Sequence, residues 1–278
     1  MKEHIIIGLG QLLVEGGEPD RNFERAEIMV RDASHNKCDL ILLPECMDLG
    51  WTHPSAKTES LTIPGLYSDK ICKLAKENNI YVCCGLTEKD DQTHKIYNSS
   101  IICDNKGKII CKYRKINILS EALDYYSIGS NLSVIDTPFG KIGLNICSDN
   151  YYDSLEIGNT LGRMGAQIIL SPSSWTVDYN ITEESDPYGE KWIKPYQTLA
   201  KIFNLVVVST TSVGYLVGGP FEGRKMVGCS LVVDKDGVIY RGNFNEIAGD
   251  LGIKKIKIPI SDIKGTLIGK RIKELDLK

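Results

Sequence analysis

The sequence predicts an α/β fold with four layers in the order αββα, in which two mixed sheets lie inside and helices cover both outer faces. Two observations predict it. Apolar runs of strand length alternate with segments whose apolar residues have helical spacing. Segments of the first half also recur, in the same order, in the second half: residues 40–45 with 168–173, 74–80 with 199–205, and 100–107 with 230–237. We interpret this recurrence as an internal duplication with pseudo-two-fold symmetry, and keep chance similarity of strand–turn segments as the alternative.

The first half is expected to form a strand, a helix, a strand, a helix and a strand, followed by a hairpin. These elements cover residues 5–14, 20–33, 39–43, 68–78 and 80–86. The spacing of Phe23, Ala26 and Val30 predicts that the first helix buries one face. Ser68 and Asp69 are of the types that cap helix N-termini, so the second helix is expected to begin there. The second half is expected to repeat this order.

The two halves are expected to pack face to face. Right-handed crossovers that progress in one direction place both helices of a half on the same face of its sheet. The bare face must be covered, and the sheet of the other half is the obvious cover. Turns at residues 105–107 and 235–237 add a hairpin to each sheet. No linker rich in Pro, Gly or Ser interrupts the chain, so residues 1–278 are expected to form one domain. Residues 261–278 are expected to be a C-terminal extension that packs on this domain or on a partner subunit.

Composition and charge exclude several classes of protein. The chain has 278 residues, 42% of them hydrophobic, and a net charge of −3 with interspersed signs. A nucleic-acid-binding surface and a polybasic membrane patch are therefore not expected, and no apolar stretch approaches the roughly 20 residues of a membrane-spanning helix. The first residues are too short and too acidic a segment for a secretory signal, so a cytoplasmic location is expected. The nine cysteines lack CxxC spacing and the four histidines lack metal-ligand spacing, so we expect no metal and no organic cofactor.

Cys147 has the surroundings of a nucleophile. It closes an apolar strand over residues 142–146 and precedes a helix that is expected to begin at Asp153, with Glu156 completing a capping box. A strand that breaks into a tight turn ahead of a helix presents its last side chain at the sheet edge and leaves the following backbone N–H groups free. The N–H of Ser148 is therefore expected to donate to the oxyanion of a substrate held at Cys147.

The thiol needs a nearby base or cation, because a free thiol with a pKa of about 8.5 is mostly protonated at neutral pH. None of the histidines has a context that marks it as the partner of Cys147. Glu45 ends a strand of the first half, and Lys115 ends a Tyr-Arg-Lys triplet. If the halves pack about a pseudo-two-fold axis, Glu45 and Cys147 can reach one crevice at the carboxyl ends of their strands. A thiol, a carboxylate and an amine are what thiol-based hydrolysis of an amide needs when no histidine serves as base.

Three motifs resemble the signatures of the nitrilase, or carbon–nitrogen hydrolase, superfamily. They are the Leu-Pro-Glu triplet ending at Glu45, the Tyr-Arg-Lys triplet ending at Lys115, and the strand that ends in Cys147, within a resemblance that covers about residues 5–258. The resemblance implies the αββα fold, catalytic roles for Glu45, Lys115 and Cys147, and a second, supporting glutamate at Glu121. It also implies a homodimer or a larger assembly. Members of the superfamily cleave amides, nitriles, carbamoyl groups or acyl chains.

The sequence says less about the substrate. Residues just after the nucleophile line the acyl pocket in this family, and members that bind a substrate carboxylate carry arginine there. Positions 150–152 are Asn-Tyr-Tyr instead, which argues against ω-amides of dicarboxylates and against amino-acid-like carbamoyl substrates. The Cys-Ser-Asp run at 147–149 also differs from the Cys-Trp-Glu of true nitrilases. The acidic segment between Trp175 and Trp192 could favour a cationic substrate, although a solvated loop is the simpler interpretation. The expected substrate-binding residues are Ser148, Asn150, Tyr151 and Trp175.

These features predict a thiol-dependent amidohydrolase that cleaves a small carboxamide through a thioester on Cys147 and releases ammonia or an amine. Hydrolysis of a nitrile or of an N-carbamoyl amine by the same three residues is the alternative enzymatic activity. A binding or scaffold protein that retains the fold is the non-enzymatic alternative. It is disfavoured because a protein without activity would not keep three reactive groups by chance.

Overall fold

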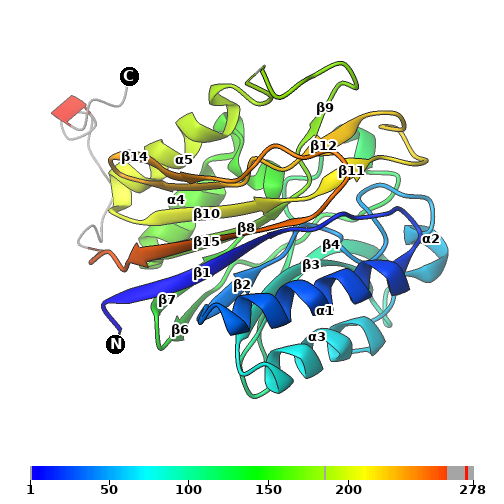
Figure 1. Cartoon of the computed structure of the whole chain (residues 1–278), viewed down its shortest axis with the longest axis horizontal. Coiled ribbons are helices and arrows are strands. Elements are labelled where there is room, and N and C mark those ends of the chain that lie inside the picture. Colours follow the sequence, from blue (N-terminus) through cyan, green and yellow to red (C-terminus); the bar gives the residue numbers. More distant parts are fainter. Residues whose placement is uncertain (1, 185, 262–272, 275–278) are drawn as a thin grey trace.

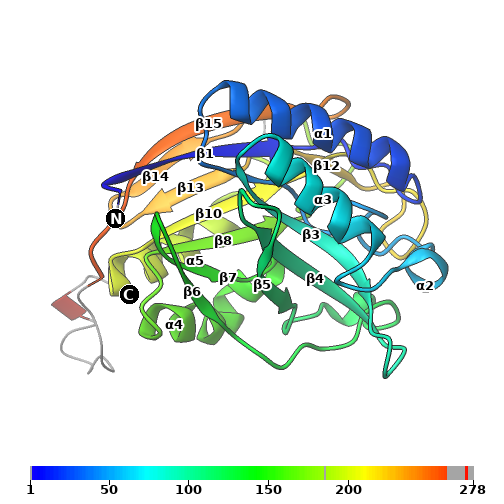
Figure 2. The same ribbon diagram turned by 90° about the horizontal axis from the view of Figure 1, so that it is seen from below.

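Two sheets of six strands each lie face to face in the middle of the molecule, and helices cover their outer faces (Figures 1 and 2). The computed structural model describes residues 2–184, 186–261 and 273–274. The predicted four-layer αββα arrangement is confirmed. The expected C-terminal extension at residues 261–278 lies outside the described residues, apart from residues 261, 273 and 274. Within the described ranges, no helix combines the length and the hydropathy that crossing a bilayer requires.

The first sheet is built mainly from the first half of the chain. Its strands, in spatial order, are β15 (Asp250–Lys257), β1 (His4–Gln11), β2 (Leu40–Leu42), β3 (Tyr81–Lys89), β4 (Ile96–Cys103) and β5 (Ile109–Arg114). Strands β1, β2 and β3 are parallel, and the other neighbouring pairs are antiparallel. The outer face carries helices α1 (Pro19–His35) and α3 (Leu66–Glu77), which follow one another along the chain with the short helix α2 (Ala56–Glu59) between them.

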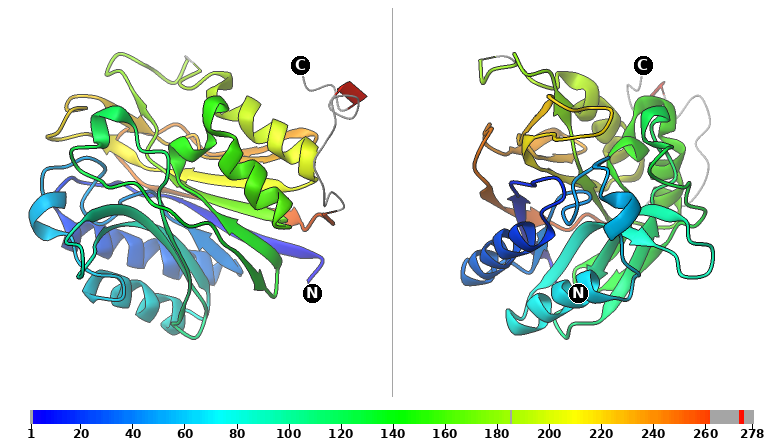
Figure 3. Two further views of the ribbon diagram at one scale, coloured as in Figure 1. Left: turned by 180° about the vertical axis from the view of Figure 1, so that it is seen from behind. Right: turned by 90° about the vertical axis from the view of Figure 1, so that its right-hand side faces the viewer.

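The second sheet repeats this order. Its strands are β14 (Gly237–Arg241), β13 (Leu231–Asp234), β10 (Val206–Thr211), β8 (Ile168–Ser173), β7 (Gly140–Leu144) and β6 (Val134–Thr137). Strands β7, β8 and β10 are parallel like β1, β2 and β3, and β6 takes the antiparallel edge position that β15 takes beside β1. Helices α4 (Glu156–Arg163) and α5 (Glu190–Phe203) cover the outer face (Figure 3). A small third sheet contains β11 (Val213–Tyr215), β12 (Lys225–Val227) and β9 (Thr176–Val177).

Successive side chains of the central strands point alternately into the space between the two sheets and into the space between a sheet and its helices. In β2, Leu40 and Leu42 belong to the cluster that includes Leu144 of the second sheet, whereas Ile41 belongs to the cluster beneath α1 and α3. Because both faces of these parallel strands are buried, their sequences are apolar without interruption. Helix α1 contributes Phe23 to the cluster beneath it, as its helical spacing predicts.

Two helices begin at different residues from those predicted. Helix α3 begins at Leu66 with Gly65 as its N-cap, and Ser68 lies in the first turn, where its hydroxyl accepts a hydrogen bond from the Gly65 N–H at 2.9 Å. Helix α4 begins at Glu156 without a side-chain cap, so the predicted capping box at Asp153 is wrong. Asp153 is instead part of the 3₁₀ turn Tyr152–Ser154, which places its backbone within helical geometry before α4 begins.

The buried carboxylate of Glu88, in β3, forms ion pairs whose contribution to the stability of the fold can be measured. Glu88 is 2% exposed and accepts hydrogen bonds from Arg114, Lys112 and Ser99 at 2.6 to 2.9 Å. Burial alone would raise the pKa of Glu88, but these donors lower it below its ordinary value of 4.5. A carboxyl whose pKa is lowered by folding stabilises the protein above its ordinary pKa, and this stabilisation is lost as the pH falls through the folded value.

We therefore expect Glu88→Gln to lower the free energy of unfolding by about 2 to 3 kcal/mol at pH 7, since two partly exposed cations lose their buried partner. The difference between variant and wild type should shrink as the pH falls below 4.5, the ordinary value for this side chain. Denaturant unfolding at a series of pH values measures it. Glu77→Gln is the control, because Glu77 is exposed in a 3.8 Å pair with Lys73 and should contribute little. A pH-independent loss at Glu88 would contradict the electrostatic explanation.

Candidate active site

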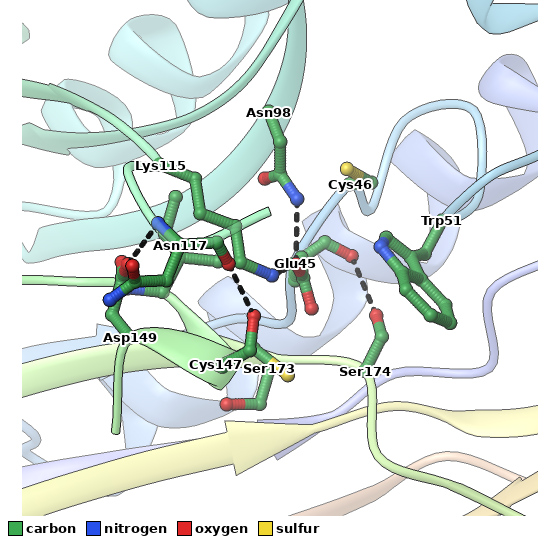
Figure 4. A network of polar contacts seen from close by, with 12 residues as sticks. Glu45, Cys46, Trp51, Asn98, Lys115, Asn117, Cys147, Asp149, Ser173 and Ser174 are labelled. Atoms are coloured by element: carbon green, nitrogen blue, oxygen red, sulfur yellow. Dashed lines mark hydrogen bonds and ion pairs between the residues drawn. The ribbon is translucent and has the colours of Figure 1, made fainter. Parts of the chain in front are cut away.

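Glu45, Lys115 and Cys147 lie together although they come from three separate strands (Figure 4). Glu45 follows β2, Lys115 comes directly after β5, and Cys147 begins a 3₁₀ turn, Cys147–Asn150, that follows β7. β2 and β7 belong to different sheets, so the carboxylate and the thiol meet where the two halves of the chain face each other. Two hydrogen bonds join the halves beside Glu45. Its N–H donates to the Ser173 carbonyl at 3.3 Å, and Ser174 Oγ donates to the Glu45 carbonyl at 3.2 Å.

Lys115 and Glu45 form a buried ion pair. The distance between Lys115 Nζ and Glu45 Oε1 is 2.7 Å, and the side chains are 2% and 0% exposed. Asn98 of β4 donates to the same oxygen at 2.6 Å, which fixes the orientation of the carboxylate. Burial alone would lower the pKa of Lys115, but the negative charges of Glu45 and then of Asp149 raise it above its ordinary value. Lys115 is therefore an ammonium at neutral pH, despite its burial.

The thiol of Cys147 is held neutral in the resting site. Burial, and after it the Glu45 carboxylate beside the thiol, raise the pKa of Cys147 to about 12. The positive charge of Lys115 and a hydrogen bond from the Ser174 backbone N–H act in the opposite direction. Glu45 Oε2 has no hydrogen-bond partner among the described residues, so this oxygen is available to a proton from the thiol. A thiol with so high a pKa needs a base at the moment it reacts.

The backbone at Cys147 has a conformation that non-glycine residues seldom adopt. Its φ is +45°, in the left-handed region, and its N–H donates to Ser171 Oγ at 3.2 Å. Non-glycine residues in such regions cluster at functional sites, where the surrounding structure must hold them. Asn150 does this here, because its Nδ2 donates to Ser171 Oγ at 2.9 Å and to the Cys147 carbonyl at 3.3 Å.

The side chain of Asn150, which was predicted to bind substrate, does not line the cavity beside Cys147. Its amide is fully buried and also exchanges hydrogen bonds with the Asn145 amide at 2.7 and 3.1 Å, so its polar atoms serve the turn itself. The side chain of Ser148 is likewise used internally, since its Oγ donates to the Asn117 carbonyl at 2.7 Å. Only the backbone N–H of Ser148 remains as the expected contact to substrate.

Glu121 does not support Lys115 in this structure, and that expectation is corrected. Glu121 is exposed on the 3₁₀ turn Ser120–Ala122, and its carboxylate accepts a hydrogen bond from Ser120 Oγ at 2.7 Å. Ala122 is the buried residue of that turn, and the side chain of Glu121 lies in solvent. The second carboxylate near Lys115 is Asp149, which is fully buried and accepts hydrogen bonds from the N–H groups of Asn117 and Ile146.

We expect Glu121→Gln to change the rate of the hydrolysis that the sequence predicts by no more than about twofold, since exposed residues away from a site contribute within about 0.5 kcal/mol. The buried counterpart, Asp149→Asn, should lower kcat by more than about tenfold, because it replaces an acceptor of two backbone N–H groups that shape the Cys147 turn. Steady-state kinetics on the two variants compare them directly. A large loss at Glu121 together with an active Asp149 variant would return the supporting role to Glu121.

Cys147 lines a cavity of about 350 Å³, and six of the sixteen residues that line it are aromatic. Trp175 and Trp192 stack with ring centroids 4.8 Å apart, and Tyr151 stacks on Trp192 at 4.9 Å. Tyr151 and Trp175 thus lie where substrate contacts were expected, whereas Ser148 and Asn150 do not line the cavity. Further lining residues that the sequence did not single out are Trp51, Tyr188, Lys191, Phe221 and Arg224. They belong to loops and a helix end, where no periodic pattern marks which side chains face a pocket.

A thiol beside a carboxylate–ammonium pair, carried on an αββα scaffold, defines the class of thiol hydrolases that use glutamate in place of histidine. The family model of the carbon-nitrogen hydrolases matches residues 7–259. The chain belongs to this family, and thus to the nitrilase superfamily; it is a carbon–nitrogen hydrolase.

Similar proteins carry amidase names. The deaminated glutathione amidase of Dictyostelium discoideum is 32% identical over 263 residues, which cover 87% of this chain and 85% of that protein. The omega-amidase NIT2 of Mus musculus is 28% identical over 215 residues, covering 74% and 73%. The crystal structure of Nit3 from Saccharomyces cerevisiae superposes with a TM-score of 0.76 at 23% identity, over 93% of this chain and 91% of that chain, which demonstrates a shared fold.

Proposed function

We propose that the protein hydrolyses the carbon–nitrogen bond of a small carboxamide through a thioester on Cys147 and releases ammonia or an amine. The observation that carries this proposal is the buried Lys115–Glu45 pair, 2.7 Å between Nζ and Oε1, next to a thiol that lines a cavity. A surface pair of this kind would be unremarkable. Burial of such a pair away from water costs desolvation free energy, so its presence here supports a functional role for the two residues.

The residues can be assigned to successive steps. Glu45 takes the thiol proton as the Cys147 sulfur attacks the amide carbon, so the sulfur–carbon bond forms without a free thiolate. Lys115 and the N–H of Ser148 stabilise the oxyanion; in other enzymes, loss of one such donor costs about 100-fold to 1000-fold in rate. Glu45 then passes its proton to the departing nitrogen as the carbon–nitrogen bond breaks. Finally Glu45 activates a water molecule, which hydrolyses the thioester to a carboxylic acid and restores the thiol.

Amides are favoured over the alternative substrates by two observations. The two curated relatives described above are named amidases, which supports a carboxamide for this chain as well. The residues after the nucleophile also differ from the pattern of true nitrilases. Nitriles and N-carbamoyl amines remain the alternatives, because Glu45, Lys115 and Cys147 would serve them equally well. A cytoplasmic location and a homodimer or larger assembly remain predictions of the sequence.

Trapping of the acyl-enzyme tests the proposed function. The protein is mixed with a panel of small carboxamides, nitriles and N-carbamoyl amines, quenched with acid after short times, and measured by intact mass and by ammonia release. We expect a mass increase equal to the acyl group on the peptide that contains Cys147, together with ammonia from the carboxamides. An adduct on a different residue, or ammonia without any adduct from a slowly hydrolysed substrate, would contradict a thioester at Cys147.

A further inference from the structure

We propose that Cys72 and Cys103 form a site of reversible oxidation, where a small-molecule disulfide such as oxidised glutathione links the two thiols and so fastens helix α3 to strand β4. Cys72 lies in α3, and Cys103 ends β4. Helix α3 packs on the outer face of the first sheet, over β3 and β4 (Figure 2). The inference does not depend on the amide hydrolysis proposed above, because both thiols lie outside the cavity beside Cys147.

The two sulfur atoms are already in contact. The distance between Cys72 Sγ and Cys103 Sγ is 2.9 Å, so bond formation at about 2.05 Å requires the sulfur atoms to approach by about 0.9 Å. Small rotations of the two side chains provide such an approach without a shift of the backbone. This is the one contact between two thiols that the described part of the chain contains.

The backbone on both sides of the pair is held in place. Asn105, in the turn after β4, donates to Asn79 Oδ1, just beyond the end of α3, at 2.8 Å. Gly107 of the same turn packs so closely on the helix that a Cβ atom there would lie 2.8 Å from the Cys72 carbonyl oxygen. These two contacts hold the helix against the turn, which keeps the two thiols facing each other.

Cys72 gives an oxidant access to the pair. All nine cysteines lie within the described residues, and Cys72 is the only one of them that is not buried. Cys103 is fully buried in the core cluster beneath α1 and α3. A partly exposed thiol can attack a disulfide that arrives from solvent, whereas a buried thiol can react only with a sulfur beside it. Cys72 is therefore the attacking residue, and Cys103 completes the bond.

The reaction consists of two exchange steps. The Cys72 thiolate attacks one sulfur of oxidised glutathione, which forms a mixed disulfide and releases the first glutathione thiolate. The Cys103 thiolate then attacks the Cys72 sulfur, which breaks the mixed disulfide, forms the Cys72–Cys103 bond and releases the second glutathione thiolate. Two electrons pass from the cysteines to oxidised glutathione, and the two thiol protons pass through solvent to the glutathione thiolates. An excess of reduced glutathione reverses both steps.

Oxidation of this pair is expected to be slow at neutral pH. Burial raises the pKa of Cys72 above its ordinary value, and the hydrogen bond with Cys103 acts in the opposite direction. The negative charges of Asp69 in α3 and of Asp104 after β4 raise this pKa further. Because the thiolate is the form that attacks a disulfide, the rate should increase about tenfold per pH unit below the pKa of Cys72.

Peptide mapping under defined redox conditions tests the site. The full-length protein is equilibrated in mixtures of reduced and oxidised glutathione, quenched by alkylation and digested. In oxidising mixtures we expect the peptides that contain Cys72 and Cys103 to be joined, with the loss of two hydrogen atoms from their summed mass, and in reducing mixtures to be separate. Free thiols at both residues in every mixture, a lasting glutathione adduct on Cys72, or a link from Cys72 to Cys84 would overturn the proposal.

Thermal unfolding of variants assigns the effect to the bond. A cross-link between residues 31 positions apart reduces the entropy of the unfolded chain, so oxidation should raise the Tm of the wild type by at least about 4 °C. Cys72→Ala and Cys103→Ala should show no rise, whatever their own starting Tm. Cys38→Ala is the matched control and should retain the full rise, because Cys38 is a buried cysteine of the same cluster. An equal rise in Cys72→Ala, or no rise in the wild type, would contradict the cross-link.

Discussion

Replacement of Cys147 by alanine is expected to abolish amide hydrolysis, with a fall in kcat of about 10⁴-fold or more, as for other nucleophiles that act within a coupled group. The reason is chemical, since alanine cannot form the sulfur–carbon bond on which both later steps depend. Stability should change by about 1 kcal/mol, because a single sulfur atom is lost from a side chain that belongs to the core cluster but also borders the cavity. Ammonia release and thermal unfolding measure the two effects separately.

Cys111→Ala is the matched control for this variant. Cys111 and Cys147 are both 6% exposed, but Cys111 lies in β5 and its thiol contacts Ser133 Oγ at 3.4 Å. Loss of a thiol as such should therefore leave the rate unchanged. The proposed reaction would be untenable if Cys147→Ala retained more than a few per cent of the ammonia release from a carboxamide.

Replacement of Lys115 by methionine is expected to affect stability and activity together. Glu45 would remain buried without its cation, at a cost of about 3 to 5 kcal/mol in the free energy of unfolding. The oxyanion would also lose its charged hydrogen-bond donor, and we expect kcat to fall by a factor of about 100 to 1000 for this reason. Denaturant unfolding and single-turnover kinetics measure the two losses in the same preparation.

The double variant Glu45→Gln/Lys115→Met separates these two effects. It removes both charges, so much of the stability should return, because neither side chain is then an uncompensated buried ion. Activity should not return, since the base and the oxyanion donor are both absent. Lys112→Met is the control in the strand that precedes Lys115, because Lys112 is 35% exposed and Glu88 keeps Arg114 as its partner. Full activity in Lys115→Met would contradict its placement in the reaction.

The fold could be predicted because its signals are periodic. Strands that are buried on both faces have continuous apolar sequences, the helix α1 places Phe23 and its neighbours on one face, and the repeated segments correspond to the repeated strand order. The positions of Glu45 and Cys147 could be inferred for a related reason. Glu45 and Cys147 each follow a parallel strand, so each lies at the carboxyl edge of its own sheet, and the face-to-face packing of the two halves brings these edges together. Lys115 follows the antiparallel strand β5, and only its sequence motif indicated its place.

The features that the sequence did not predict correctly depend on the direction in which an individual side chain points. Asn150 and Glu121 both lie in 3₁₀ turns, where no repeat indicates which side chain faces the site. Asn98 is one of several small polar residues in β4, and only its contact with Glu45 distinguishes it. Lys191 lines the cavity but stands within an acidic segment, where no pattern in the sequence marks it.

The position of the site between the two halves has a consequence for the newly made chain. Glu45 is synthesised long before Cys147, and hydrogen bonds between residue 45 and residues 173 and 174 hold the two halves together beside it. A nascent polypeptide that has folded only its amino-terminal portion contains Glu45 but lacks Cys147. The proposed hydrolysis therefore requires that both portions of the chain have been synthesised and have docked.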